Sequence, residues 1–220
     1  FIGKNIIHLH SVNSTNLYAL DLIKNNSVEE GVAILTEYQT SGKGQQNNSW
    51  ESEKSKNLLL SVIFHPNFIK VDKQFLISKA VSLAVADFVK TKVANVTVKW
   101  PNDIYVDDKK ISGILIENTL SGNIINNTIV GIGLNINQTV FKSDAPNPVS
   151  LKILTNKTYN LDDCFNQLCF YIEKRYNELK KDFKKTNSDY LKNLYLFNSF
   201  NLYESKGKKF LARIVDVEDN

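Results

Sequence analysis

The sequence has little or none of several residues on which common protein chemistries depend. Its 220 residues include no methionine, two cysteines and three histidines. The cysteines, Cys164 and Cys169, lie five positions apart in a helical pattern and on different faces, which disfavours a disulfide; we expect buried free thiols in a reducing cytoplasm. The histidines are scattered and indicate no catalytic triad. Since methionine is absent, we expect the natural start of the protein to lie outside this sequence.

Long hydrophobic runs and a strong excess of one charge are also absent. No apolar run approaches the length of a membrane helix, and the first residues do not form a secretory signal. The net charge of +4 suits a protein that handles anionic ligands. The basic residues are dispersed, and no nucleic-acid-binding module is recognisable, so no nucleic-acid partner is expected.

Apolar spacing predicts helices that alternate with groups of strands. We expect one helix that begins at residues 14–16, two long helices over 72–91 and 161–183, and a further helix that ends at 191–196. The expected strands cover 4–10, 31–38, 58–64, 96–99, 104–106, 111–117 and 124–135. From about Phe200 the apolar residues alternate with polar ones, which predicts strands of a small β module cut short at the C-terminus. We expect an exposed sheet edge near 124–135, where a second copy can pair.

Three segments indicate a small-molecule site built on a sheet. In Lys99-Trp100-Pro101-Asn102-Asp103, a strand ends on a lysine before a rigid turn, so a cation lies where an anionic group can dock. The loop Gly42-Lys43-Gly44 can turn backbone N–H groups toward a phosphate or carboxylate, although its spacing matches neither a P-loop nor a Rossmann fingerprint and plain turns of this kind are common. Gly131 and Gly133 lie in a strand where the backbone can approach a ligand closely.

The order of five segments resembles that of biotin–protein ligases over about the first three quarters of the chain. These segments are Ser14-Thr15-Asn16, Glu37 to Trp50, Lys99 to Asp103, Lys110 to Glu117, and Gly131 to Asn135. The resemblance implies an α+β fold of the class II synthetase-like, biotin–lipoate ligase type, with a mixed, mainly antiparallel sheet and flanking helices. It also implies a ligase catalytic domain over 1–197 and, from 198 to 220, the start of a truncated SH3-like C-terminal domain.

The resemblance implies a reaction in two steps that needs no protein nucleophile. ATP, with Mg²⁺, activates biotin as biotinyl-5′-AMP, and a lysine of a biotin carboxyl carrier protein domain then takes the biotin. Cations and N–H donors must surround the phosphate, and water must be kept out while the adenylate waits. We expect a cytoplasmic enzyme of the monofunctional type without an N-terminal DNA-binding domain, as a monomer or weak homodimer.

The resemblance also implies roles for individual residues. Lys99 is the expected catalytic residue, acting on the biotin carboxylate and the α-phosphate, with an exposed strand-end lysine paired with an acid as the alternative. The expected biotin-binding residues are Ser14, Thr15, Asn16, Gln39, Gly42, Gly113, Gly131 and Gly133, and the expected ATP- and adenylate-binding residues are Lys43, Gly44, Gln45, Trp50, Lys99 and Asn135. Asp103 is a candidate for Mg²⁺, with a turn role as the alternative. Residues 14–16 also suit simple helix capping, and Trp50 suits burial in the core.

The loop that the family usually builds with arginines has none here. It reads from Gly42 to Trp50 with Lys43 as its one charged residue, and Lys43 lacks the bidentate fork of arginine. Either a weaker electrostatic hold on the adenylate or compensation by lysines elsewhere, such as Lys54 and Lys56, is therefore expected. Two alternatives stay open: a lipoate–protein ligase or octanoyltransferase of the same fold, and a biotin-binding or regulatory protein without turnover.

Overall fold

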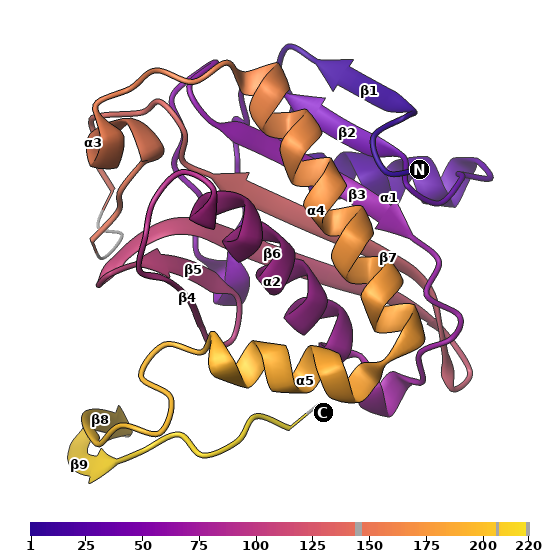
Figure 1. The fold of residues 1–220 in the computed structure, drawn as a ribbon. Coiled ribbons are helices and arrows are strands. Elements are labelled where there is room, and N and C mark those ends of the chain that lie inside the picture. Colours follow the sequence, from indigo (N-terminus) through magenta and orange to yellow (C-terminus); the bar gives the residue numbers. More distant parts are fainter. Residues whose placement is uncertain (144–146, 206, 219–220) are drawn as a thin grey trace.

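The computed structural model describes residues 1–143, 147–205 and 207–218, and is built on one seven-stranded sheet (Figure 1). The strands are β1 (Ile6–Leu9), β2 (Ala33–Thr36), β3 (Leu58–Phe64), β4 (Val96–Lys99), β5 (Asp103–Val106), β6 (Lys109–Ser121) and β7 (Ile124–Leu134), in the order β1-β2-β3-β7-β6-β5-β4. Only β1 and β2 pair in parallel, and the other neighbours in this sheet are antiparallel. The mixed, mainly antiparallel α+β fold is therefore confirmed.

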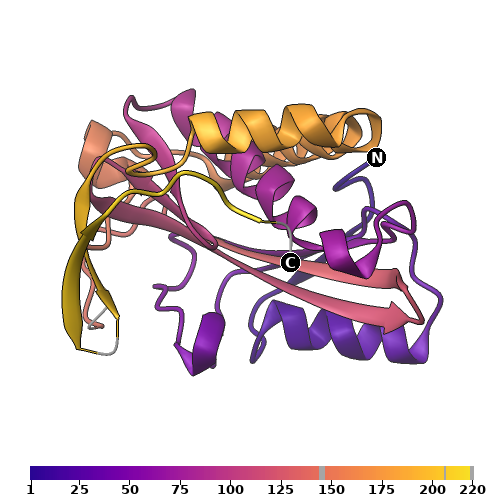
Figure 2. The same cartoon turned by 90° about the horizontal axis from the view of Figure 1, so that it is seen from below.

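Helices cover both faces of this sheet. The α-helices are α1 (Thr15–Asn25), α2 (Phe75–Lys90), α3 (Leu151–Thr155), α4 (Leu161–Lys181) and α5 (Phe183–Lys192); two short 3₁₀ turns are η1 (Gln45–Asn47) and η2 (Val71–Lys73). Figure 2 shows α2, α4 and α5 on one side of the sheet, with α1 and η1 on the other. The larger core lies on the three-helix side, where α2 is apolar nearly all round and is buried along most of its length. The smaller core under α1 leaves room for a site on that side.

The expectation of a free edge near residues 124–135 is wrong. β7 lies between β3 and β6: it pairs with β6 along its length and with β3 over residues 128–134, because β6 and β7 form a long hairpin and β3 completes the sheet beside it. The outermost strands are β1 and β4, and β6 is also an edge beyond Gly113, because β5 pairs with its residues 109–113 alone among the described strands. The edge at β4 is partly covered, since Val98 pairs with Leu194 after α5.

Both cysteines are buried and free, as the sequence predicts. Cys164 and Cys169 both lie on the side of α4 that packs on the core, so the expectation of different faces is wrong, because the buried side of α4 is broad enough to include both. Burial raises the pKa of the Cys169 thiol to about 12, so it stays protonated at neutral pH. These thiols serve packing.

The C-terminal residues form a separate two-stranded antiparallel sheet of β8 (Asn201–Ser205) and β9 (Lys208–Ala212). Its large apolar side chains Leu202, Phe210 and Leu211 are exposed. The strand pair matches the alternation seen in the sequence. The division of the chain into a catalytic domain over 1–197 and a second domain from 198 stays a prediction.

Arg175 connects the three helices of the larger core, and its replacement by alanine is expected to lower the free energy of unfolding by about 3 kcal/mol. Its guanidinium on α4 donates to Asp87 on α2 at 2.7 Å and to Asp189 on α5 at 2.8 Å, and only 13% of the side chain is exposed. Alanine leaves two partly buried carboxylates without this partner. Chemical denaturation measures the loss.

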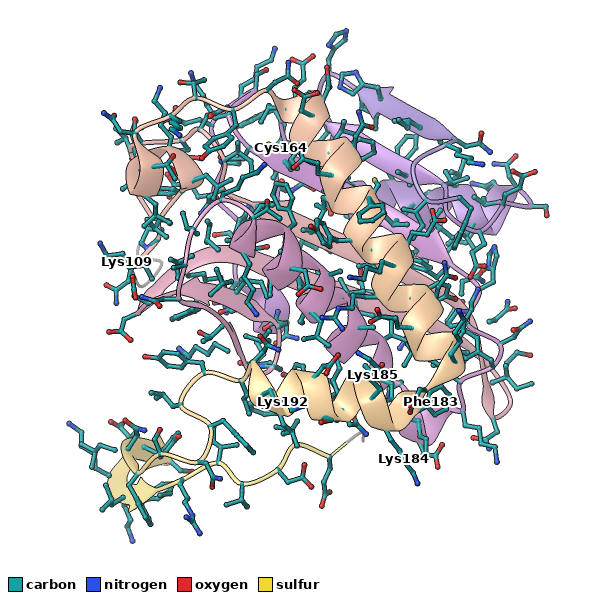
Figure 3. All side chains as sticks on the ribbon, in the orientation of Figure 1. Lys109, Cys164, Phe183, Lys184, Lys185 and Lys192 are labelled. Carbon is teal, nitrogen blue, oxygen red and sulfur yellow. The ribbon has the colours of Figure 1, made fainter. Side chains whose placement is uncertain are left out.

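The matched control is Lys185→Ala on α5 (Figure 3), because Lys185 also bonds Asp189 but is half exposed; a change within about 1 kcal/mol is expected there. Burial raises the pKa of Asp189, but the bonds from Lys185 and Arg175 outweigh this effect and lower it below its ordinary value. A carboxyl with a lowered folded-state pKa stabilises above its unfolded pKa, so this contribution is lost as the pH falls below about 4. Equal losses for the two variants would contradict this role for Arg175.

Candidate active site

A cavity of about 280 Å³ lies on the α1 side of the sheet, beneath the loop that carries η1. β6 and β7 form its floor, the loop forms its roof, and the turn between β4 and β5 closes one end. The predicted site residues among its lining are Ser14, Thr15, Asn16, Gln39, Lys43, Gly44, Gln45, Trp50, Asp103, Gly113, Gly131 and Gly133. Segments far apart in the sequence therefore meet at one cavity, whose volume is near the lower end of the range for small-molecule sites.

One end of the cavity is a network of hydroxyl and amide groups. Thr15 donates its backbone N–H to Gln39 Oε1 at 2.8 Å, and its hydroxyl lies 3.1 Å from the same oxygen. Asn16 Nδ2 donates to Glu117 Oε2 at 2.7 Å. Ser14 is the N-cap of α1, yet its side chain makes no capping bond, so capping does not account for these polar residues. Thr15 and Asn16 are buried and are oriented by these bonds, while Gln39 is half-buried and Glu117 is exposed.

Ser61 on β3 connects this network and is a residue that the sequence reading missed. Its hydroxyl lies 2.7 Å from Thr15 Oγ1 and 2.6 Å from Asn16 Oδ1, and the residue is fully buried. The available signal was a single polar residue within the otherwise apolar strand Leu58–Phe64. A buried hydroxyl needs partners, and here those partners are two side chains of the cavity.

Gly131 lies directly beneath Asn16. A Cβ atom at Gly131 would lie 2.3 Å from Asn16 Oδ1, so the absence of a side chain is what lets Asn16 reach the sheet. In this structure the glycine therefore makes space for a protein side chain that lines the cavity.

Trp50 lies against Gly113 and Gly133. A Cβ atom would meet the indole at 2.9 Å on Gly113 and at 2.3 Å on Gly133. The indole Nε1 is buried without a hydrogen-bond partner among the described residues, which is costly unless a ligand supplies one. Trp50 is thus part of the cavity and lies on the sheet, as the two glycines permit.

The loop above the cavity is a small hairpin. Lys43 and Ser49 form an antiparallel β-bridge. On either side of it, Gly44 N–H donates to the carbonyl of Asn48 at 2.7 Å, and Trp50 N–H donates to the carbonyl of Gly42 at 2.9 Å. Gly42 is buried, and a Cβ atom there would lie 2.7 Å from the carbonyl oxygen of Trp50. Gly42 therefore permits the close approach of the two arms of the hairpin and does not itself line the cavity.

Two lysines near the site, Lys110 and Lys99, differ in their position relative to the cavity. Lys110 lines the cavity, bonds Asp103 Oδ1 at 2.7 Å and lies 5.7 Å from the centre of the Trp50 ring. Lys99 lies opposite Asp103 on the edge strand β4, is exposed, and donates to the hydroxyl of Tyr105 at 3.0 Å. In the part of the chain that is described, Lys99 is outside the lining of this cavity. The cavity lysine that the sequence reading missed is Lys110.

Asn135 also lies outside that lining, as far as the described residues go. Its Nδ2 donates to the carbonyl of Val149 at 3.1 Å, while its Oδ1 is buried without a partner among the described residues. The observed contact fastens the segment before α3 to the end of β7. The predicted role in adenylate binding is not visible in this contact and stays a prediction.

Among the described residues, the charged ones that line the cavity are Lys43, Lys110 and Asp103, two cations against one anion. This balance favours an anionic ligand. Within residues 1–143, 147–205 and 207–218, no group of three or more histidine, cysteine, aspartate or glutamate residues is placed to hold a metal ion. No helix in the same ranges is long and apolar enough to cross a membrane.

The part of the chain that forms this cavity is similar to a known protein family. The model of the biotin/lipoate A/B protein ligase family matches residues 9–135, which include the network, the loop and both lysines. The bifunctional ligase/repressor BirA of Bacillus subtilis is 31% identical over 138 residues, covering 62% of this chain and 42% of that protein. The biotin–[acetyl-CoA-carboxylase] ligase of Mycobacterium tuberculosis is 30% identical over 142 residues, covering 63% of this chain and 51% of that protein.

A solved structure extends the likeness to nearly the whole chain. The biotin protein ligase of Aquifex aeolicus in complex with biotin and ATP superimposes with a TM-score of 0.81 at 25% identity, covering 98% of this chain and 89% of that one. The chain spans about half of the length of the curated relatives that it matches. Because the family model matches more than half of the residues, the chain belongs to the biotin/lipoate A/B protein ligase family.

Proposed function

We propose that this chain is an ATP-dependent biotin–protein ligase. The observation that carries the proposal is the cavity itself, where an amide and hydroxyl network at one end faces a lysine at the other. Biotin has the same two ends: a ureido ring that needs donors and acceptors, and a carboxylate that needs a cation. The related protein from Aquifex aeolicus was solved with biotin and ATP bound, which supports the same two ligands here.

The network suits the ureido ring because its amide orientation is fixed. Gln39 Oε1 accepts from Thr15, which leaves Nε2 as the donor end of the same amide. Asn16 is held by Ser61 and Glu117, so its orientation is fixed before a ligand arrives. Preorganised polar groups of this kind give specificity, because a ligand without matching groups leaves them unpaired. We assign ring recognition to Thr15, Asn16 and Gln39, with Ser14 and Gly131 beside them.

The lysine end suits the activation of a carboxylate. An oxygen of the biotin carboxylate attacks the α-phosphorus of ATP; the new P–O bond forms as the bond to the β-phosphate oxygen breaks, and pyrophosphate leaves. Negative charge grows on the phosphoryl oxygens, and a cation at Lys110 stabilises that growth. We therefore assign Lys110 to this step. Lys43, Gly44 and Gln45 in the loop above are proposed to contact the phosphates of the adenylate.

The second step moves the acyl group to a protein. The neutral amine of an acceptor lysine attacks the carbonyl carbon of the mixed anhydride; the C–N bond forms, the C–O bond to AMP breaks, and the nitrogen loses a proton to solvent. We propose that the acceptor is the biotin carboxyl carrier domain of a carboxylase and that Trp50 with its loop keeps water from the anhydride. Mg²⁺, when bound with ATP, neutralises phosphate charge, and Asp103 is the carboxylate of the described lining that can approach it.

Release of pyrophosphate separates the proposed activity from its alternatives. Purified protein with ATP and Mg²⁺ is incubated with biotin, with lipoate or with neither. We expect release that depends on biotin and stays at background with lipoate. Release with lipoate alone would support the lipoate ligase, and binding of biotin without release would support a regulatory protein. Either result would overturn the proposal.

A further inference from the structure

A second and larger cavity, of about 630 Å³, adjoins the first at the turn between β4 and β5. The two share the wall formed by Trp100, Pro101, Asn102 and Ile114, together with Gln45 from the loop. Asn102 fixes this wall, because its backbone carbonyl accepts from the N–H of Ile114 at 3.0 Å. Trp100 stands at the rim and is 56% exposed. The second cavity therefore opens beside the site of the proposed chemistry.

The chemistry of the second cavity is opposite to that of the first. Its interior is apolar, lined by Phe75 on α2, Ile116 on β6 and Ile214 with Val217 near the C-terminus. Among the described residues, two charged ones line it, Asp216 and Glu218. Both are acidic and exposed. Two carboxylates repel ATP, pyrophosphate or an acyl adenylate and attract a cation. A second anionic substrate is thus disfavoured, and a cationic and apolar partner fits.

The outer wall of this cavity is held in place by a buried lysine. Lys79 on α2 is 1% exposed, and its Nζ donates to the carbonyl of Val217 at 2.8 Å and to Asn187 Oδ1 on α5 at 2.8 Å. Burying an ammonium group is costly unless strong hydrogen bonds compensate. Here those bonds tie the segment of residues 214–218 to two helices. The wall is consequently preformed, which lowers the entropic cost of binding a partner.

We propose that this second cavity binds the acceptor protein: an apolar side chain next to the acceptor lysine enters it, and the two carboxylates attract the lysine as it arrives. The proposal rests on the proposed ligase activity and adds where the acceptor docks. Its support is the shared wall with the first cavity and the charge complementarity. An acceptor held here presents its lysine across Trp100, on the side of the wall where Lys110 lies.

Two variants test the proposal by separating acceptor binding from adenylation. Ser78 lines the second cavity only, so Ser78→Trp fills it, and the double variant Asp216→Lys with Glu218→Lys reverses its charge. Adenylation is followed with hydroxylamine, a small acceptor that needs no docking, and transfer is followed with a purified biotin carrier domain. We expect the KM for the carrier domain to rise about tenfold in both variants, with hydroxylamine-dependent turnover within about twofold of the wild type. The effect of charge reversal should shrink as salt is raised.

The controls carry the same changes far from the cavity. Lys174→Trp places the same bulk on the exposed side of α4, and Asp21→Lys with Asp162→Lys reverses two exposed charges on α1 and α4. Both should keep the wild-type KM for the carrier domain. A wild-type KM in the charge-reversed variant, which changes only exposed residues, would overturn the proposal even if Ser78→Trp fails to fold. Absence of biotin-dependent turnover with hydroxylamine in the wild type would instead overturn the proposed ligase activity.

Discussion

Replacing Lys110 with alanine is expected to lower the rate of biotin-dependent pyrophosphate release about 100-fold or more, the loss typical of removing one group that stabilises transition-state charge. Lys110 lines the cavity, its Nζ lies 2.7 Å from Asp103 Oδ1, and a quarter of its side chain is exposed. A partly buried cation acts more strongly on developing negative charge than an exposed one. Single-turnover measurement of pyrophosphate at saturating biotin and ATP gives the rate.

The matched control is Lys99→Ala, which removes the same charge from the neighbouring edge strand. Lys99 is exposed, and its Nζ donates to the hydroxyl of Tyr105. Because water screens an exposed charge, we expect the rate of pyrophosphate release to change by no more than about threefold. Lys110→Arg keeps the charge but not the compact ammonium, and is expected to restore only part of the rate. A large loss in Lys99→Ala with a near-normal Lys110→Ala would show that Lys99, as the sequence predicts, performs the step.

Replacing Gly131 with alanine is expected to raise the KM for biotin about 100-fold while leaving the KM for ATP nearly unchanged, since a displacement of about 1 Å at a binding group has effects of this size. The new Cβ atom would lie 2.3 Å from Asn16 Oδ1. Asn16 cannot move aside without loss, because Ser61 and Glu117 hold both ends of its amide. Steady-state kinetics with each substrate varied in turn measures both constants.

The control for this substitution is Gly122→Ala at the turn between β6 and β7. A Cβ atom there meets nothing within 4 Å, although the positive φ of +60° makes alanine mildly strained. This variant should lose a little thermal stability and keep its KM for biotin. A wild-type KM in Gly131→Ala would mean that the network around Asn16 does not recognise biotin.

The sequence predicts where the helices and strands lie better than it predicts which strands pair with one another. The strand over 58–64 is visible as an apolar run, and the helix over 72–91 as a 3.6-residue repeat, because both patterns follow from local geometry. The central position of β7 is not visible, since a buried strand reads the same wherever it pairs. The expected dimer edge was wrong for that reason.

The sequence likewise predicts some residues of the candidate site and misses those whose position depends on strand pairing. The resemblance to biotin–protein ligases places Asn16, Gln39 and Gly131 at the site, and all three line the cavity. The choice between Lys99 and Lys110 depends on strand pairing: the register of β5 with β6 shifts between Ile104 and Tyr105, and this shift places Lys110 opposite Tyr105. Ser61 acts through side chains more than forty positions away in sequence. No local pattern shows the register shift, and for Ser61 the sequence shows only one polar residue in an apolar strand.

The most direct measurement is the mass of a purified biotin carrier domain after incubation with this protein, biotin, ATP and Mg²⁺. We expect one biotinyl group on one lysine, dependent on ATP, and strongly reduced formation of this product with the Lys110→Ala protein. An unmodified carrier domain in the presence of a protein that binds both biotin and ATP would contradict the ligase activity, and equal modification by Lys110→Ala would contradict the site.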